Sequence, residues 1–225
     1  MMGRSFREMI VAASAFAAMT ALGGTASALP SAPIYSFGPV SPNVFGTVAL
    51  NAGMTAYDVR WRRVSGADQT DPRIAEIAAA CSSLSNLQKL ALVHTEVNRR
   101  VMWRADLDGY GIADYWANAG ETLTKGVGDS EDIAVVKIQA LKAAGFNPRD
   151  LYLSVGRDSK RGADALLLVR ADGRFYVLDD RAARPLTPEE HAKFVPIITL
   201  GANGKTWLHG RNIAAGGAQR TRTAR

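Results

Sequence analysis

A hydroxyl and three carboxylates stand together in residues 126–145, where a helix is expected to begin. Ser130 follows Asp129 and precedes Glu131 and Asp132. A polar residue at the N-terminus of a buried helix occupies a position where an enzyme would hold its nucleophile. Carboxylates there either complement the helix dipole or offer a hard cation the oxygen ligands that it prefers. The residue types leave nucleophilic chemistry, cation binding and plain helix capping open.

The surrounding residues specify the helix itself. Gly126 and Gly128 permit a tight turn, and Asp129 or Ser130 can serve as N-cap. Gly145 fits the C′ position that ends such a helix. The apolar residues recur at three- and four-residue spacing, so one face is built for burial: Ile133, Val136, Ala140, Leu141 and Ala144.

Upstream of this stretch, two further helices are predicted. Asp71-Pro72 is typical of a helix start, and residues 85–100 carry a long apolar stripe. Residues 30–58 are expected to be irregular apart from a short strand at residues 44–50. Residues 102–110 are expected to form a loop. Asp106 and Asp108 in it faintly resemble a calcium loop, but no later acidic ligand follows, so an Asx turn is favoured.

Downstream, the pattern changes from helical to strand-like. Strands are predicted at residues 151–155, 165–170 and 175–179, with a tight turn at residues 171–173. Residues 185–210 are expected to be partly irregular, with Trp207 covering the sheet. The order predicts an α+β fold, in which helices pack on an antiparallel β-sheet.

The N-terminal residues 1–28 have the features of a secretory signal peptide. Arg4 and Arg7 precede an apolar run, and Ala26-Ser27-Ala28 has the small residues of a cleavage site. The alternative is a membrane anchor, since the run is near the minimum length for a span. Cleavage is favoured, and it implies a periplasmic or secreted protein with no stable membrane insertion afterwards.

The cysteine content and the charge distribution limit the disulfides that can form and the kinds of partner that the protein can bind. Cys81 is the single cysteine, so no intramolecular disulfide forms, and it is expected to be a small buried residue. The formal charge of +6 is modest, and four arginines lie in the last fifteen residues. That stretch has the composition of a basic disordered tail. Basic residues interleaved with aromatics on a structured face are missing, which argues against nucleic-acid binding.

The order of motifs from residue 87 to residue 210 resembles a known family, the bacterial transglutaminase-like cysteine proteinases. The motifs are Val97-Asn98, Asp114-Tyr-Trp116, Gly128-Asp-Ser-Glu-Asp-Ile-Ala-Val-Val-Lys137, Leu141 to Gly145, Ala165-Leu-Leu-Leu-Val169, Tyr176-Val-Leu-Asp179 and Trp207 to Gly210. The resemblance implies a papain-like fold for the proteinase-like domain at 85–210. Together with the patterns at the two ends of the chain, it gives four segments: a signal peptide at 1–28, an irregular and helical segment at 29–84, that domain, and the tail at 211–225.

The resemblance also implies where catalytic groups belong. In the family the helix begins Gly-Asp-Cys-Glu-Asp, with the Cys as nucleophile. A His at the start of the strand that corresponds to residues 164–169 is the base, and the Asp of a Val-Leu-Asp motif orients that base. The matching positions here hold Ser130, Asp164 and Asp179. Two of the three catalytic groups are therefore substituted.

These substitutions predict poor catalysis. A serine hydroxyl does not ionise near neutral pH and needs a base within reach, and a carboxylate is poorly matched to that task. Two neighbouring carboxylates, Asp164 and Asp179, are expected to raise each other's pKa. His94, His191 and His209 do not obviously rescue the site.

A cation site is the second implication of the resemblance. Adhesin-releasing periplasmic members bind calcium through acidic residues beside the nucleophile, and the matching residues are Asp129 and Glu131. Asp132 and Asp164 offer further oxygens. No cofactor is otherwise required. The alternative is that these residues only complement the helix dipole.

Three functions compete. The leading hypothesis is a degenerate member, a pseudoenzyme, that binds a protein or peptide, such as a cell-surface or periplasmic protein. The second is an active peptidase that hydrolyses a peptide bond of such a protein with altered catalytic residues. The third is an envelope protein whose site has drifted without a ligand.

Overall fold

An antiparallel sheet and a buried helix form the centre of the computed structural model, which describes residues 40–66 and 71–211. The sheet strands are β1 (Thr47–Ala52), β4 (Leu151–Asp158), β5 (Gly162–Ala171), β6 (Arg174–Leu178), β7 (Phe194–Gly201) and β8 (Thr206–Arg211). Their order is β1-β8-β7-β4-β5-β6, and every neighbouring pair is antiparallel. The predicted α+β class is confirmed.

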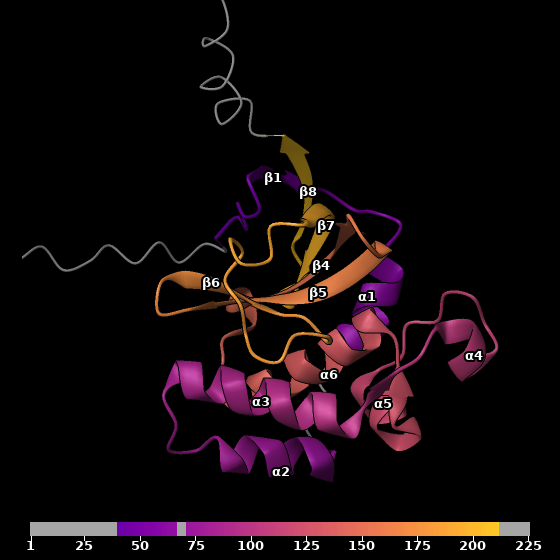
Figure 1. Cartoon of the computed structure of the whole chain (residues 1–225), viewed down its shortest axis with the longest axis vertical. Coiled ribbons are helices and arrows are strands. Elements are labelled where there is room, and N and C mark those ends of the chain that lie inside the picture. Colours follow the sequence, from indigo (N-terminus) through magenta and orange to yellow (C-terminus); the bar gives the residue numbers. More distant parts are fainter. Residues whose placement is uncertain (1–39, 67–70, 212–225) are drawn as a thin grey trace, which may run out of the picture. The chain divides into compact units, whose positions relative to one another are not determined.

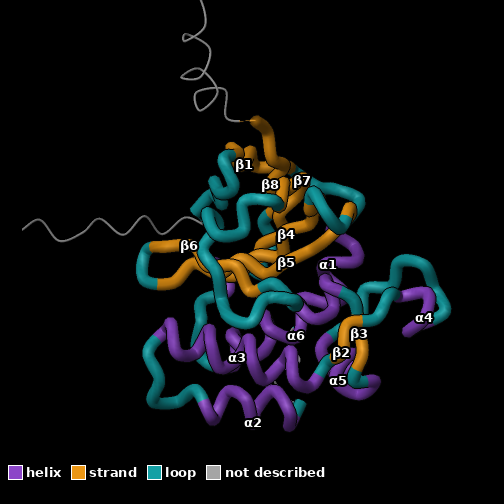
Figure 2. Tube along the Cα trace, in the orientation of Figure 1, coloured by secondary structure: helices purple, strands orange, loops and turns teal. Residues whose placement is uncertain are grey.

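The helices gather on one face of this sheet (Figure 1). They are α1 (Asp58–Ser65), α2 (Pro72–Ala80), α3 (Asn86–Arg100), α4 (Asp106–Tyr110), α5 (Ala119–Lys125) and α6 (Ser130–Ala143), with a 3-10 turn at Pro148–Asp150. A separate parallel pair consists of β2 (Met102–Trp103) and β3 (Val127–Gly128), which lie side by side in Figure 2. The described residues belong to the compact unit that begins at Gly38.

Helix α6 is the helix predicted for residues 126–145. Asp129 is its N-cap, with its side chain accepting a hydrogen bond from the amide of Asp132 at 3.3 Å. Gly145 has a φ of +93°, which favours glycine at the C′ position. The helix packs on β5 and β4 and against α2, α3 and α5. Because neighbours surround it, its sequence is buried on nearly all sides rather than on one face.

Strand β5 has an unbroken run of apolar residues because both of its faces are buried. Alternate residues Ala165, Leu167 and Val169 join the core shared with α6. Leu166 and Leu168 belong to a second core with Tyr152 and Trp207 on the other face.

The other predictions are mostly, but not wholly, confirmed. Asp71 caps α2, Ser85 forms a capping box at the start of α3, and Cys81 is buried. The loop expected at residues 102–110 is wrong, since it holds β2 and α4, which are too short to give a periodic signal. Helix α1 was also missed: it buries only Trp61 and Val64 among charged residues.

Residues 185–210 differ most from expectation. They contain β7 and most of β8, which pair with each other and join β4 to β1. Trp207 lies within β8 and is buried in the second core. Polar residues and Pro196 interrupt the alternation of these strands, so they resemble irregular chain in sequence.

The predicted signal peptide and basic tail lie outside the described residues. No helix among the residues that the structure describes is long and apolar enough to span a membrane.

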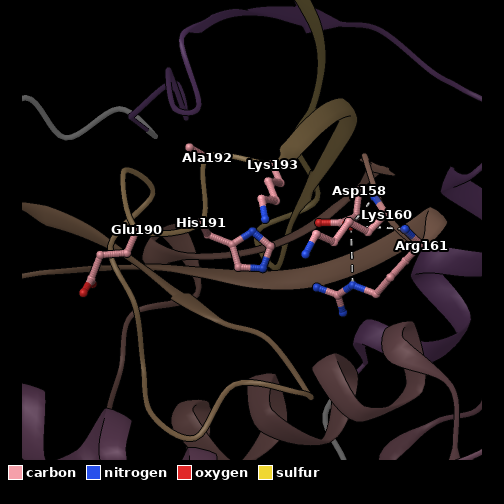
Figure 3. A pocket seen from close by; sticks show the side chains of 7 residues that line it. All are labelled: Asp158, Lys160, Arg161, Glu190, His191, Ala192 and Lys193. Carbon is pink, nitrogen blue, oxygen red and sulfur yellow. Dashed lines mark hydrogen bonds and ion pairs between the residues drawn. The ribbon is translucent and has the colours of Figure 1, made fainter.

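The β4–β5 turn faces the connection that enters β7 across a cavity of about 400 Å³ (Figure 3). The two segments are held together by the amide of Ser159, which donates to the carbonyl of Lys193 at 3.2 Å. The cavity lies next to Asp179, because His191 lines it and also contacts that carboxylate.

Candidate active site and cation site

Ser130 is the first residue of α6 and is buried. The parallel pairing of Trp103 with Gly128 brings an indole beside it, and Trp103 Nε1 donates to Ser130 Oγ at 3.2 Å. Gly128 is required here for space, since a Cβ on it would lie 2.7 Å from Cβ of Asp132. The turn, the short strand pair and the helix start together fix the position of the hydroxyl.

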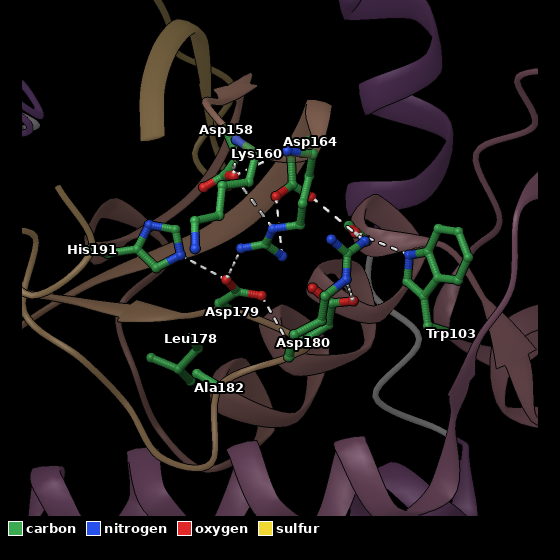
Figure 4. Close-up of polar contacts among 12 residues, drawn as sticks. Trp103, Asp158, Lys160, Asp164, Leu178, Asp179, Asp180, Ala182 and His191 are labelled. Carbon is green, nitrogen blue, oxygen red and sulfur yellow. Dashed lines mark hydrogen bonds and ion pairs between the residues drawn. The ribbon is translucent and has the colours of Figure 1, made fainter. Parts of the chain in front are cut away.

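Asp164 accepts a hydrogen bond from Ser130, as the family positions imply, and Arg161 joins Asp164 to Asp179; both carboxylates are drawn in Figure 4. Arg161 Nη2 donates to Asp179 Oδ2 at 2.9 Å, and its Nη1 lies 3.3 Å from Asp164 Oδ2. Its Nε lies 3.6 Å from Asp158. One guanidinium therefore forms ion pairs with three buried carboxylates.

A second arginine, Arg181, lies beside Ser130. Its Nη2 donates to Ser130 Oγ at 3.4 Å and lies 3.9 Å from Asp164 Oδ1. The guanidinium also lies over the ring of Trp103, 5.1 Å from its centroid. We call Asp164, Asp179, Arg161 and Arg181 the arginine centre.

The expectation that the two carboxylates raise each other's pKa holds for Asp164, whose pKa is raised by burial and also by Asp179, and is wrong for Asp179. Burial alone would raise the pKa of Asp179, but hydrogen bonds from His191 and Arg161 hold it well below its usual range. Burial does raise the pKa of Asp164, although Arg161 and Arg181 oppose that effect. The sequence carried no spacing signal for these arginines, because Arg161 lies in a charged turn and Arg181 follows a strand.

His191 is a site residue that sequence reasoning missed. Its Nε2 lies 2.6 Å from Asp179 Oδ2, and this contact raises the pKa of the imidazole. The two residues are 12 positions apart along an irregular connection, so only the fold brings them together. Ser130 has no imidazole partner among the described residues. The Nε2 of His94 contacts the carbonyl of Ala182, and both ring nitrogens of His209 contact threonines.

On the other side of α6 lies a group of acidic residues, Asp106, Asp129 and Asp132, which we call the acidic cluster. One carboxylate oxygen from each lies within 4.8 Å of the others. Asp106 and Asp132 are held by amides: Asp106 accepts from Tyr115 and Asp132 from Ala117, each at 2.7 Å. Asp106 therefore belongs to this cluster, whereas the sequence favoured an ordinary Asx turn there.

The cluster has oxygen atoms without partners. Oδ1 of Asp106 and Oδ2 of Asp132 are buried and accept no hydrogen bond. Burial and mutual repulsion raise the pKa of Asp129 to about 10 and that of Asp132 to about 8. These are the hard oxygen donors that calcium prefers, so the residues fit such an ion. Glu131, the other predicted ligand, lies next to the cluster without being one of the three.

The fold and the site together define a papain-like, transglutaminase-like protein: a buried helix presents residue 130 to Asp164 of the antiparallel sheet, and Arg161 joins Asp164 to Asp179. Residues 62–195 match the sequence model of the bacterial transglutaminase-like cysteine proteinase family. Because this match spans more than half of the chain, the protein belongs to that family.

Solved structures agree on the fold. EGTA-treated LapG of Legionella pneumophila is similar with a TM-score of 0.54 and 20% identity, over 73% of this chain and 95% of LapG. Calcium-bound LapG from the same organism gives 0.54 and 19%, over 67% and 87%. The sequence matched none of the curated proteins with which it was compared.

Proposed function

We propose that this protein is a catalytically degenerate member of its family that binds a protein or peptide segment at the site around Ser130. The observation that carries the proposal is the set of donors around the Ser130 hydroxyl. Its oxygen accepts from the Trp103 indole and the Arg181 guanidinium, neither of which can take up a proton at neutral pH.

Asp164, the remaining candidate for a base, accepts a hydrogen bond from Ser130 but is poorly suited to deprotonate it. It is held between two guanidiniums, at 3.3 Å from Arg161 and 3.9 Å from Arg181. Burial raises the pKa of this carboxyl, but the two guanidiniums oppose that rise, and accepting a proton from Ser130 would weaken its pairing with both of them. An active peptidase with altered residues would need an imidazole or amine on Ser130 Oγ, and the described residues place a guanidinium and an indole there instead.

Covalent labelling tests the loss of catalysis. We expect no reaction of Ser130 with a fluorophosphonate and no peptide hydrolysis, with Ser130→Ala behaving as the native chain does. Labelling that disappears in Ser130→Ala would overturn the proposal.

Restoring the family residues tests whether the fold can still support proteolysis. Ser130→Cys with Asp164→His alone leaves an imidazole beside Arg161 and Arg181, whose charges disfavour its protonated form. We therefore expect proteolysis only when Arg181→Ala is added. The matched control is Ser130→Cys with Arg181→Ala, which keeps Asp164 and so has a thiol without an imidazole beside it.

We further propose that the acidic cluster binds calcium, held by Asp106, Asp129 and Asp132 with Glu131 beside them. Its two unpartnered buried oxygens and crowded carboxylates support this role. When bound, the cation would neutralise the carboxylates and tie α4, the segment at Tyr115 and the start of α6 together. Calorimetric titration with calcium tests the proposal, and binding that survives Asp132→Asn would contradict this assignment.

The proposed partner is a cell-surface or periplasmic protein, in keeping with the predicted signal peptide. Capture of partners from an envelope extract, with an acidic-cluster variant as control, separates this function from that of an envelope protein without a ligand. A partner retained by the native protein and by Ser130→Ala, but not by Asp132→Asn, is the expected result.

A further inference from the structure

The cavity between the β4–β5 turn and the start of β7 is lined by an excess of positive charge. Its residues are Asp158, Lys160, Arg161, Glu190, His191, Ala192 and Lys193. Figure 3 shows the amines of Lys160 and Lys193 close to the His191 ring. The two amines come close enough for Lys160 to lower the pKa of Lys193. Like charges meet here although each lysine is exposed and free to point elsewhere.

The acidic residues of the cavity do not neutralise these amines. Glu190 pairs with Arg184 at 2.7 Å and points away from the ring in Figure 3. Asp158 accepts from the backbone amides of residues 160 and 161 and faces Arg161 Nε. The ion pairs of this region are made by Arg161, Arg184 and His191. Among the described residues, neither lysine amine lies within 4.0 Å of a carboxylate.

A buried atom of His191 supplies an independent sign of a ligand. The residue is 8% exposed and is held through Nε2 by Asp179, so its ring orientation is fixed. Its Nδ1 is buried and has no hydrogen-bond partner. Because the contact with Asp179 favours the protonated ring, Nδ1 carries a hydrogen that needs an acceptor. An unpaired buried donor costs free energy that an anionic acceptor would recover.

We propose that this cavity binds the carboxylate of an acidic peptide segment, with the Lys160 and Lys193 amines and His191 Nδ1 as its donors. The inference rests on the proposed function, because it gives the chemistry of the peptide that the site binds. Arg161 adds positive charge to the cavity, but its N–H groups already face Asp158, Asp164 and Asp179, so it is not counted as a donor to the ligand. Point-charge amines and one ring N–H suit a single carboxylate, from a side chain or a chain end.

The imidazole resonances provide a direct readout, because the chain has three histidines. The probes are the blocked peptide Ac-Ala-Asp-Ala-NH2, its Asn counterpart, the free acid Ac-Ala-Ala-Ala, and inorganic phosphate. We expect the Asp peptide or the free acid to shift the ring signals of His191, assigned with His191→Gln, and to leave His94 and His209 unmoved. Removing both amines in Lys160→Gln/Lys193→Gln should weaken binding about tenfold.

The matched control is Lys89→Gln/Lys205→Gln, which removes two lysines elsewhere and should leave binding unchanged. The inference is overturned if the Asn peptide shifts His191 equally, if the lysine variant binds as tightly as the native chain, or if only phosphate produces the shift. A comparison of the Asp peptide with the free acid separates a side-chain carboxylate from a chain end. Fluorophosphonate labelling of Ser130 would refute the proposed function without changing this result, so the two failures are distinguishable.

Discussion

Two acidic regions flank Ser130, and the protein treats their charge in opposite ways. In the arginine centre, Asp179 has its pKa held far below the usual range by partners that include Arg161 and His191. In the acidic cluster, burial and neighbouring carboxylates raise the pKa of Asp129 to about 10. The residue type is the same and both are substantially buried, so the difference lies in the partners.

The contrast separates charge balanced within the chain from charge that needs an added partner. Arg161 and Arg181 lie among the carboxylates of the arginine centre and form ion pairs with them. No cation of the described chain reaches the three oxygens of the acidic cluster, as its unpartnered atoms indicate. The arginine centre therefore contains its own positive charges, whereas the acidic cluster has none within contact distance among the described residues and could accept a metal ion.

The largest expected effect comes from breaking the arginine centre. Asp179→Asn removes the charge that pairs with Arg161 and His191, and leaves two cations facing each other in a partly buried place. We expect a loss of about 3 kcal/mol in the free energy of unfolding at pH 7, measured by urea denaturation. Asp150→Asn, which removes a more exposed partner of Arg170, should cost less than about 1 kcal/mol. Equal costs for the two variants would contradict the comparison.

The same substitution in the acidic cluster should have the opposite sign. Asp129→Asn keeps a good N-cap for α6 and removes a carboxyl whose raised pKa makes the folded chain take up a proton at pH 7. In the presence of EGTA we expect it to stabilise the protein by about 1 kcal/mol at pH 7, because folding no longer requires the buried carboxyl at position 129 to take up a proton. The same variant should lose the rise in Tm that calcium gives the native chain. Destabilisation without metal would mean that the cluster is not under repulsion.

The pH dependence of stability should also distinguish the two regions. The pKa of Asp132 in the folded chain is about 8, against an ordinary value of 3.8. The folded state therefore holds more protons between these pH values, so the stability present below about pH 4 is lost as the pH rises towards 8. Asp179 contributes in the opposite direction: its pKa is lowered, so its stabilisation is present above about pH 4 and is lost on acidification.

Urea denaturation in EGTA at pH 5, 6, 7 and 8 measures this slope. We expect stability to fall over the range in the native chain and to change less in Asp132→Asn. Calcium should flatten the native curve, since it balances the ionised carboxylates, and so its stabilising effect should be larger at pH 8 than at pH 5. A calcium effect that is larger at pH 5 would refute this account of the cluster.

Sequence reasoning reached the helix-centred half of the site because local signals specify it. Glycines, caps and apolar spacing predicted α6, and the motif order placed Ser130, Asp164 and Asp179 together. The remaining site residues come from segments without periodic signal: Arg161 from a turn, Arg181 and His191 from the connection after β6. Asp106 lies in a one-turn helix. Their roles depend on long-range packing, which no local pattern of a single sequence expresses.

A thiol at position 130 would report on both regions at once, with the smallest expected effect. In Ser130→Cys, Arg181 and the N-terminus of α6 lower the thiol pKa, whereas the metal-free acidic cluster raises it. We expect calcium to lower the thiol pKa by about 0.5 units and Arg181→Gln to raise it by about the same amount. Alkylation by iodoacetamide as a function of pH measures both shifts.

The chain offers clean controls for this measurement. Cys81 is buried and its pKa is raised by burial, so it should react slowly, and Cys81→Ala removes it altogether. Arg184→Gln removes an exposed arginine paired with Glu190 and should leave the thiol pKa unchanged. If calcium shifts the thiol pKa and Arg181→Gln does not, then only the acidic cluster affects the electrostatic potential at position 130. The inferred contact of Arg181 with Ser130 is then wrong. If Arg181→Gln shifts it and calcium does not, the cluster either binds no calcium or lies electrostatically apart from the hydroxyl.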